Sequence, residues 1–406
     1  MQKSRPSRKL YIFIRRLLVL PLLFLTMFFL VLYLTAPQYF FVEPKPFEGS
    51  YINNPYKSLD TNSFRTTLFS APEVPLGTII IGDDQMMLES IQNEFQEFDH
   101  VEMVMRQKLF RNEIFKSDKL YSYQHGLGFA NPSMFCIGAR KNLWIDYPFF
   151  NNIHYKQGLI EKLLNDCDMV ALNPASFTAE EIKYLSGYQL IDLGNNTKNA
   201  AALWDSALSN GHLVYGFATE KEFGFGIHNS FNVDYLVVNP DFDSTQALMD
   251  AIKQGSSYVV THQQDLGVQR NHEKLASERP FLVSAFLNAD TFYVSTSQTA
   301  SFFKFISQKG KLLHLDENTS SASCVFGAED NYMRVEIVFP DGTKFFLNPL
   351  TRHFTANTNK QNLASIDVTK TALMRGVYII LIVILLQIIF KWQMSKLKIK
   401  NTNEQM

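Results

Sequence analysis

The chain has 406 residues, of which 46% are hydrophobic, so it can bury a large core and form more than one domain. Its formal net charge is −1, with 38 Lys and Arg residues against 39 Asp and Glu residues, and this balance gives no electrostatic basis for a nucleic-acid partner. The three cysteines, Cys136, Cys167 and Cys324, are odd in number and widely spaced, which excludes a disulfide framework and a zinc motif; they fit small buried side chains, or one bridged pair in an oxidising compartment.

The N-terminal segment predicts a membrane anchor. Residues 17–36 are apolar except for Thr26 and Thr35, and about 20 apolar residues span a bilayer. The run is longer than the roughly 7–15 apolar residues of a signal peptide and lacks a small-residue cleavage site, which favours an uncleaved helix. The preceding tail, residues 1–16, is basic through Lys3, Arg5, Arg8, Lys9, Arg15 and Arg16.

The central region predicts alternating strands and helices. Residues 37–62 form a Pro- and aromatic-rich connector, which indicates extended chain. From residue 63 to residue 280, short apolar runs alternate with amphipathic stretches, a pattern typical of βαβ units and a parallel sheet or barrel. The expected strands are 77–82, 101–105, 134–138, 169–172, 190–193, 214–218 and 235–238, and the expected helices are 85–98, 156–166, 178–185, 199–209 and 244–254.

Individual residues mark some of the helix ends. Thr178 precedes a helix with Glu180 and Glu181 in its first turn, where acidic charge suits the helix dipole. Gly211 and Gly255 stand where C-terminal caps are expected.

The pattern changes in the C-terminal part of the chain. Residues 281–356 contain period-two and aromatic-rich runs joined by turns such as Pro340-Asp341-Gly342, which predicts a small antiparallel β module. A linker, residues 357–371, leads to a second apolar span, residues 372–390. The tail of residues 391–406 is basic again, so both termini are predicted to be cytoplasmic and the region between the spans to lie outside the cytoplasm; an ordinary solvated tail is the alternative.

Several groups of residues together resemble a known family. They are Trp204-Asp205 with Leu208, Ser209 and Gly211; the stretch Ala247–Tyr258; and Tyr332-Met333-Arg334-Val335-Glu336 followed by Asn348-Pro349-Leu350-Thr351-Arg352. In this order, over most of residues 64–354, they resemble the polymerase and histidinol phosphatase (PHP) superfamily, in particular its membrane- or envelope-associated bacterial members. The resemblance implies a distorted seven-stranded (β/α) barrel with two or three metal ions at the C-terminal ends of its strands, which hydrolyses phosphate esters.

With this resemblance, the expected fold class is α/β. The folded region is expected to be flanked by two transmembrane helices. A distorted (β/α)7 PHP-like barrel covers residues 63–280, and the antiparallel β module of residues 281–356 follows it.

The positions where that family carries metal ligands hold other residues here. An opening His-x-His would fall on Phe69 and Ala71, an Asp-His pair on Met105 and Arg106, a glutamate on Arg140, a histidine on Asn173, and an Asp-x-His on Lys221-Glu222-Phe223. Phe, Ala and Met do not bind a hard divalent ion, and Arg and Lys repel one. We therefore infer from the sequence a pseudo-phosphoesterase with no catalytic residue, metal or other cofactor.

The replacements allow two uses of the former metal site. Arg106, Arg140, Asn173 and Lys221 are candidate binding residues for an anionic ligand, such as a phosphate or an acidic sugar, held without metal. Alternatively, the cations pair internally with Glu102, Glu220, Glu222 or Asp83 and only plug the pocket. The aromatic stretch 144–150 is either a partner-binding surface or a further plug of the barrel mouth.

The sequence thus favours a catalytically inactive scaffold or accessory subunit of a bacterial envelope complex. The chain is predicted to sit in the inner (cytoplasmic) membrane through two helices, with its main domain in the periplasm and a protein partner in the envelope. The alternatives are a metal-independent binding module for an anionic ligand and a residual metal-dependent phosphoesterase.

Overall fold

The computed structural model describes residues 8–57, 59, 63–71, 98–107, 114, 121–126, 133–147, 152–194, 199–220, 234–240, 244–262, 279–356 and 361–403. The chain divides into two compact units. Met1–Phe40 and Ser365–Met406 make up the first, which we call the helical unit, and Phe41–Ala364 make up the second, which we call the sheet unit.

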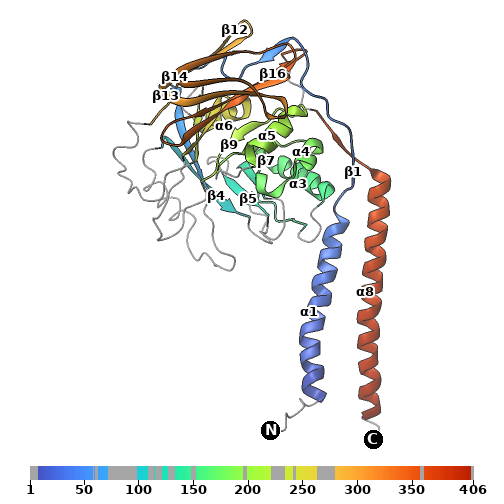
Figure 1. Ribbon diagram of the computed structural model, residues 1–406. Helices are drawn as coiled ribbons and strands as arrows, with labels where there is room; N and C mark the ends of the chain where they lie inside the picture. Colours follow the sequence, from blue (N-terminus) through green and yellow to red (C-terminus); the bar gives the residue numbers. More distant parts are fainter. Residues whose placement is uncertain are drawn as a thin grey trace, which may run out of the picture. The chain divides into compact units, whose positions relative to one another are not determined.

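The helical unit contains two antiparallel helices, α1 (Arg8–Leu34) and α8 (Val368–Asn403), which lie side by side (Figure 1). The end of α1 meets the beginning of α8: the rings of Tyr33 and Tyr378 have centroids 6.0 Å apart, and Arg375 Nε donates to the carbonyl oxygen of Leu34 at 3.1 Å. Strand β1 (Tyr39–Phe41) pairs with β17 (Ala364–Ile366) in a separate two-stranded sheet. The beginning of α1 and the end of α8 therefore lie at the same end of the helix pair, away from the contact of Tyr33 with Tyr378.

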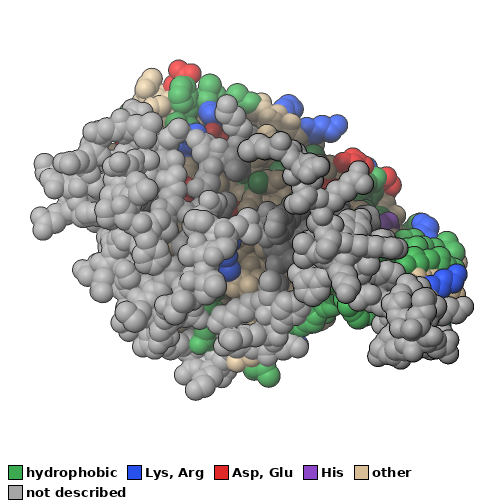
Figure 2. All heavy atoms as spheres, turned by 90° about the horizontal axis from the view of Figure 1, so that it is seen from below, with side chains coloured by type: hydrophobic (Ala, Val, Ile, Leu, Met, Phe, Trp, Pro, Cys, Tyr) green, Lys and Arg blue, Asp and Glu red, His purple; other side chains and the backbone are tan. Residues whose placement is uncertain are grey.

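One of the two predicted membrane spans meets the length and hydropathy expected of a membrane helix. Within the described residues, Val368–Lys391 has 24 residues with a mean hydropathy of 2.5, whereas Leu18–Leu34 is a shorter apolar helix. The N-terminal helix ends at Leu34, before the predicted limit at residue 36, because Pro37 disfavours helical conformation in the residue before it. Exposed side chains of both helices are largely hydrophobic, and hydrophobic atoms make up part of the described surface in Figure 2.

The sheet unit is built on one large mixed sheet. Its strand order is β12-β13-β15-β16-β11-β10-β3-β4-β5-β6-β7-β8-β9, with β14 added on β13 and β2 on β16. The strands are β2 (Tyr51–Asn53), β3 (Arg65–Ser70), β4 (His100–Arg106), β5 (Ser122–His125), β6 (Met134–Ala139), β7 (Cys167–Leu172), β8 (Leu190–Asp192), β9 (Tyr215–Phe217), β10 (Tyr235–Val238), β11 (Ser257–His262), β12 (Leu282–Asn288), β13 (Thr291–Ser307), β14 (Lys311–Val325), β15 (Tyr332–Val338) and β16 (Thr343–His353).

The strands β3 to β9 do not form the closed (β/α)7 barrel expected from the sequence. Among the described residues no ladder joins β9 to β3, the last and first strands of this series; an isolated bridge between Ser70 and Glu220 connects them. In addition, β6 runs antiparallel to both of its neighbours. Only residues 126–133 connect β5 to β6, and a parallel strand needs a crossover of roughly a dozen residues or more.

Four helices of the sheet unit begin and end close to the predicted positions. Thr178 and Glu181 form a reciprocal capping box, in which Glu181 N donates to Thr178 Oγ1 at 3.2 Å and Thr178 N donates to Glu181 Oε2 at 2.9 Å. Gly211 and Gly255 have φ of 75° and 79°, the left-handed conformation that ends a helix. The helices are α3 (Ile153–Asp166), α4 (Ala179–Tyr184), α5 (Ala200–Ser209) and α6 (Thr245–Gln254), with short 3₁₀ turns η2 (Pro174–Ser176) and η3 (Gln308–Gly310).

The strands from β12 to β16 are antiparallel, as the C-terminal pattern predicts. The turn at Asp341-Gly342 joins β15 to β16, with Thr343 N donating to Asp341 Oδ1 at 2.9 Å. The sheet continues from β16 into β11 through a ladder that pairs Tyr258 with Leu347. The regions on either side of residue 280 therefore share one sheet.

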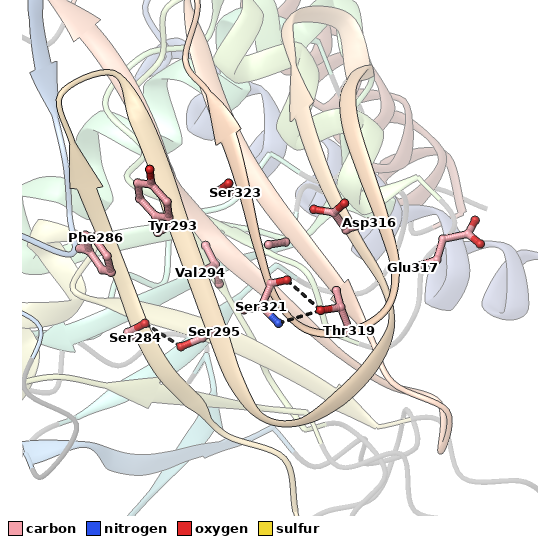
Figure 3. A pocket seen from close by; sticks show the side chains of 11 residues that line it. Ser284, Phe286, Tyr293, Val294, Ser295, Asp316, Glu317, Thr319, Ser321 and Ser323 are labelled. Carbon is pink, nitrogen blue, oxygen red and sulfur yellow. Dashed lines mark hydrogen bonds between the residues drawn. The ribbon is translucent and has the colours of Figure 1, made fainter.

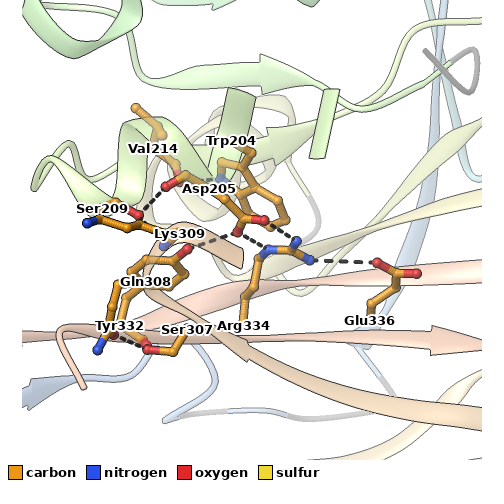
Figure 4. A network of polar contacts seen from close by, with 10 residues as sticks. All are labelled: Trp204, Asp205, Ser209, Val214, Ser307, Gln308, Lys309, Tyr332, Arg334 and Glu336. Carbon is orange, nitrogen blue, oxygen red and sulfur yellow. Dashed lines mark hydrogen bonds and ion pairs between the residues drawn. The ribbon is translucent and has the colours of Figure 1, made fainter. Parts of the chain in front are cut away.

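A buried charged pair ties α5 to this antiparallel part (Figure 4). Arg334 Nε and Nη2 each donate to one carboxylate oxygen of Asp205 at 2.7 Å, and both residues are buried. The Tyr332 hydroxyl donates to the same carboxylate at 2.9 Å, and the guanidinium lies 5.2 Å from the centroid of the Trp204 ring. Such bidentate geometry constrains orientation as well as distance.

The remaining residues of the C-terminal motif also hold the backbone together. Asn348 Nδ2 donates to the carbonyl oxygens of Gly255 and Ser257 at 3.0 and 2.8 Å, while its Oδ1 accepts from Gly216 N at 2.8 Å. This one side chain therefore connects β16, β11 and β9. Arg352 Nη2 donates to the carbonyl oxygen of Phe326 at 2.9 Å and lies over that ring.

Replacing Arg334 with Met should destabilise the protein by about 3–5 kcal/mol, because it leaves the Asp205 carboxylate buried without its cation. Lys304→Met is the control. Lys304 lies on β13 and pairs with Glu336 of β15, the strand of Arg334, but it is half-exposed, and such pairs contribute about 1 kcal/mol or less. Chemical denaturation of both variants measures the difference. Equal losses in the two variants would contradict the role given to the buried pair.

Candidate functional site

The carboxyl ends of six strands face the same edge of the curved sheet. Strands β3, β4 and β5 are parallel, β7, β8 and β9 are parallel, and the antiparallel β6 between the two groups gives them one direction. Ligand sites of α/β folds lie at this edge. We call it the strand-end edge.

Three phenylalanine rings occupy the interior just below the strand-end edge. The ring of Phe217, at the end of β9, has its centroid 4.8 Å from that of Phe69 on β3 and 6.4 Å from that of Phe135 on β6. All three side chains are completely buried. Phe69 is one of the residues that stands at a ligand position in the sequence comparison, and here it is part of the apolar core.

Three buried carboxylates, Asp192, Glu220 and Asp234, stand at the strand-end edge, and two of them, Asp192 and Asp234, approach Gly194. Asp192 Oδ1 accepts from the backbone nitrogens of Gly194 and Thr219 at 3.1 Å each, and its Oδ2 accepts from Thr219 Oγ1 at 2.9 Å. Glu220 Oε2 accepts from the backbone nitrogen of Asp234 at 3.0 Å. A Cβ added at Gly194 would lie 3.1 Å from both Asp192 Oδ1 and Asp234 Oδ2, so any larger residue here would have to displace these carboxylates slightly.

These carboxylates act first as hydrogen-bond acceptors for the loops that cross the edge. Asp192 fixes the turn after β8 to the segment after β9, and Glu220 fixes that segment to the start of β10. In the described part of the chain, no group of three His, Cys, Asp or Glu side chains is placed to hold a metal ion. The expectation that the protein uses no metal stays a prediction.

Of the four predicted binding residues, two lie at the strand-end edge. Arg106 ends β4 and is exposed. Asn173 follows β7, and its Oδ1 accepts from Ala175 N at 3.1 Å, so its side chain caps the turn η2. Lys221 lies outside the described residues, as do Glu222 and Asp83.

The fourth predicted binding residue, Arg140, lies at the opposite edge of the sheet. It follows the antiparallel strand β6, and its Nη1 donates to Asp168 Oδ1 at 2.9 Å, at the beginning of β7. Asn173 follows the other end of β7, roughly 16 Å away at about 3.3 Å per residue. Arg140 therefore does not share a pocket with Arg106 and Asn173, and its ion pair with Asp168 is exposed on both sides.

Two histidines, His125 at the end of β5 and His212 before β9, are buried. Burial lowers the pKa of His125, whose Nε2 lies 3.0 Å from the carbonyl oxygen of Ile145. Burial likewise lowers the pKa of His212, whose Nε2 lies 2.9 Å from the carbonyl oxygen of Lys183. Both rings serve local packing, and His228 lies outside the described residues.

The aromatic stretch 144–150 is described as far as residue 147. Tyr147 is buried, with its ring centroid 5.1 Å from that of Tyr155 on α3, so this part packs against a helix. The three cysteines are free thiols.

Sequence reasoning missed Asp192 and Asp234 as members of this site. Each stands next to an apolar strand, Asp192 as the last residue of β8 and Asp234 directly before β10. An acidic residue next to an apolar strand can indicate a site residue. The sequence alone, however, does not show which end of the strand faces the site, because this depends on strand direction. For Asp234 that direction is visible only in the antiparallel pairing of β10 with β3.

Comparisons with known proteins leave the family of this chain open. No family model matches it, and no curated protein matches its sequence. A solved structure from Bacteroides vulgatus, described as a two-domain protein containing a predicted PHP-like metal-dependent phosphoesterase, is similar over 75% of this chain and 99% of its own, with 10% identity and a TM-score of 0.34. That description names the superfamily seen in the sequence motifs, but a similarity of this size establishes neither family nor activity.

The buried carboxyl group of Glu102, on β4, should make stability depend on pH. Burial raises the pKa of Glu102 well above its ordinary value, so the native state retains a proton that the unfolded chain loses. Stability contributed by this group therefore falls as pH rises above the unfolded pKa of about 4.3, with a limiting slope of about 1.4 kcal/mol per pH unit.

Glu102→Gln should remove this dependence. The variant is expected to gain stability relative to the wild-type protein as pH is raised from about 5 to about 8, as measured by urea denaturation at each pH. Glu180→Gln, an exposed site in the first turn of α4, should show no such trend. A constant difference between Glu102→Gln and wild type across this range would contradict a buried, protonated Glu102.

Proposed function

We propose that this chain is a membrane-anchored protein whose sheet unit binds partner proteins of the bacterial envelope and does not hydrolyse phosphate esters. The observation that carries the proposal is the packing of Phe69, Phe135 and Phe217 below the strand-end edge. Metal-dependent phosphoester hydrolysis needs an open, polar site for two or more cations and a water molecule. Closely packed aromatic rings exclude both at that depth.

The polar groups at the edge support the same proposal, since they are engaged in holding the fold. Asp192 accepts three hydrogen bonds from neighbouring loops, and Asn173 caps a turn. Lys156, which is buried, donates to Glu181 Oε1 at 2.7 Å and to the carbonyl oxygen of Ser176 at 3.0 Å. Satisfied groups of this kind stabilise a scaffold.

A second candidate function is a residual metal-dependent hydrolase built on the buried carboxylates Asp192, Glu220 and Asp234. The approach of Asp192 and Asp234 at Gly194, with Glu220 accepting from the backbone nitrogen of Asp234, is the observation that favours it. A binding module for anionic ligands is less well supported, because Arg140 lies at the edge opposite Arg106 and Asn173 and is paired with Asp168.

The helical unit supports the proposed anchoring. The helix Val368–Lys391 is long and apolar enough to cross a membrane, and α1 runs antiparallel to it with Leu18–Leu34 as its apolar part. Basic residues follow the span in the sequence, at Lys391, Lys396, Lys398 and Lys400. By the positive-inside rule we propose that both termini are cytoplasmic and that the sheet unit is periplasmic, in the inner membrane.

Metal analysis of the purified full-length protein, combined with hydrolysis of a chromogenic phosphodiester, separates the two functions. We expect no stoichiometric Mn, Fe or Zn and no hydrolysis above background, together with a protein partner that co-purifies in fixed proportion under mild conditions. Two or three equivalents of metal, with hydrolysis that chelation abolishes and Asp192→Asn reduces by 100-fold or more, as roughly expected for a lost catalytic group, would establish the hydrolase instead. Asp168→Asn, at the opposite edge, is the matched control.

Reporter fusions test the topology. A fluorescent protein that matures only in the cytoplasm should fluoresce when it is fused before Met1 and when it is fused after Met406, because basic flanks are retained on that side. A fusion that replaces the chain after Ala364 should be dark, since one crossing then places the reporter in the periplasm. Fluorescence of this truncated fusion would contradict the N-terminal span.

A further inference from the structure

An open groove lies on one face of the strands β12, β13 and β14, away from the strand-end edge (Figure 3). Its volume is about 510 Å³, within the range of about 300–1,000 Å³ found for small-ligand sites. The lining consists of two aromatic rings, hydroxyl side chains, two carboxylates and two aliphatic side chains: Phe286, Tyr293, Ser284, Ser295, Thr319, Ser321, Ser323, Asp316, Glu317, Val294 and Ala322.

The two aromatic rings form one wall of the groove. Phe286 and Tyr293 are cross-strand neighbours with ring centroids 5.1 Å apart and planes inclined by 13°, so they stack. Phe286 remains 48% exposed and Tyr293 38% exposed, so this stacked pair presents aromatic surface to solvent. On the other side of Tyr293 the cross-strand residue is Ser323, whose small side chain leaves that face of the ring uncovered.

Hydroxyl groups form the floor. Ser284 Oγ and Ser295 Oγ lie 2.6 Å apart in one row across the strands, and Ser321 is the next residue of this row on β14. A register shift between Ser295 and Ala300 interrupts the β13–β14 ladder and bends the hairpin at this point. The bend makes the face concave.

Asp316 and Glu317 follow one another on β14 at the other end of the lining, and their carboxylates point apart (Figure 3). Asp316 Oδ1 lies 3.1 Å from His314 Nε2, whereas Glu317 forms no ion pair with any residue in the described ranges. Among the described residues, no Lys or Arg side chain belongs to the lining. Negative charge without a cation disfavours phosphate, acidic sugars and nucleic acid as occupants.

We propose that this groove binds a saccharide chain made of neutral or amino sugars. A sugar ring has an apolar face of C–H groups, which stacks on an uncovered aromatic face, and a rim of hydroxyls, which exchange hydrogen bonds with serines and carboxylates. Purely apolar ligands would cover these hydroxyls and carboxylates without offering them hydrogen bonds in place of water. The inference is independent of the function proposed above.

An extended peptide is the competing occupant. It would add to the free edge of β12 or β14 through backbone hydrogen bonds. The groove lies across the face of these strands, over side chains of all three, so its contents contact side chains and not the strand edge. This placement favours the saccharide.

Binding is tested with the full-length protein in lipid nanodiscs, which avoids detergents with sugar head groups. Isothermal titration with cellohexaose as the neutral probe and chitosan hexamer as the amino-sugar probe should show saturable binding of at least one. Tyr293→Ala should weaken that binding about tenfold, because the stacking face is lost, and Tyr293→Trp should retain it. Val325→Ala, an exposed apolar site on the same hairpin outside the lining, is the control.

Glu317→Gln provides a second variant that does not depend on the aromatic pair. Its side chain is exposed and forms no ion pair with described residues, so folding should be unchanged while the affinity for the amino-sugar probe falls. The proposal is overturned if neither saccharide binds saturably, if binding is unaffected by both Tyr293→Ala and Glu317→Gln, or if an unstructured peptide binds in their place.

Discussion

The charged pair of Asp205 and Arg334 determines how the two parts of the sheet unit meet. One residue lies on α5 and the other on β15, 129 positions later in the chain, and both are removed from water. Neither charge is tolerated there without the other, because the cost of burying a lone charge exceeds most single contributions to stability. The bidentate contact and the Trp204 ring over the guanidinium then specify one orientation of helix against sheet.

This constraint changes what the sequence resemblance means. The residues that carry it, among them Trp204, Asp205, Arg334 and Asn348, are those that join helix to sheet and strand to strand. The resemblance in these residues therefore concerns how the helix and the strands pack. Catalysis depends on different side chains at the strand ends, and a chain can keep the packing residues while its strand ends carry phenylalanine and loop-binding carboxylates. Resemblance in the first set is therefore no evidence of chemistry in the second.

Surfaces available for binding lie elsewhere on the sheet unit. The antiparallel strands β12 to β14 carry exposed aromatic rings, serines and carboxylates in a concave face, whereas the strand-end edge is closed below by apolar packing. A sheet that is continuous from β12 to β9 supports both regions on one rigid element. Recognition by a side-chain face of a stable sheet requires little reorganisation.

Local signals in the sequence determined the helices, the apolar segments and the antiparallel C-terminal strands. The capping box at Thr178, the glycine after α6 and the period-two runs act within a few residues, and the structure agrees with each. Strand direction and closure were decided only by tertiary structure. The antiparallel course of β6 separated Arg140 from Asn173, and the pairing of β10 with β3 brought Asp234 toward Asp192. Both depend on pairing between distant strands, which no local pattern encodes.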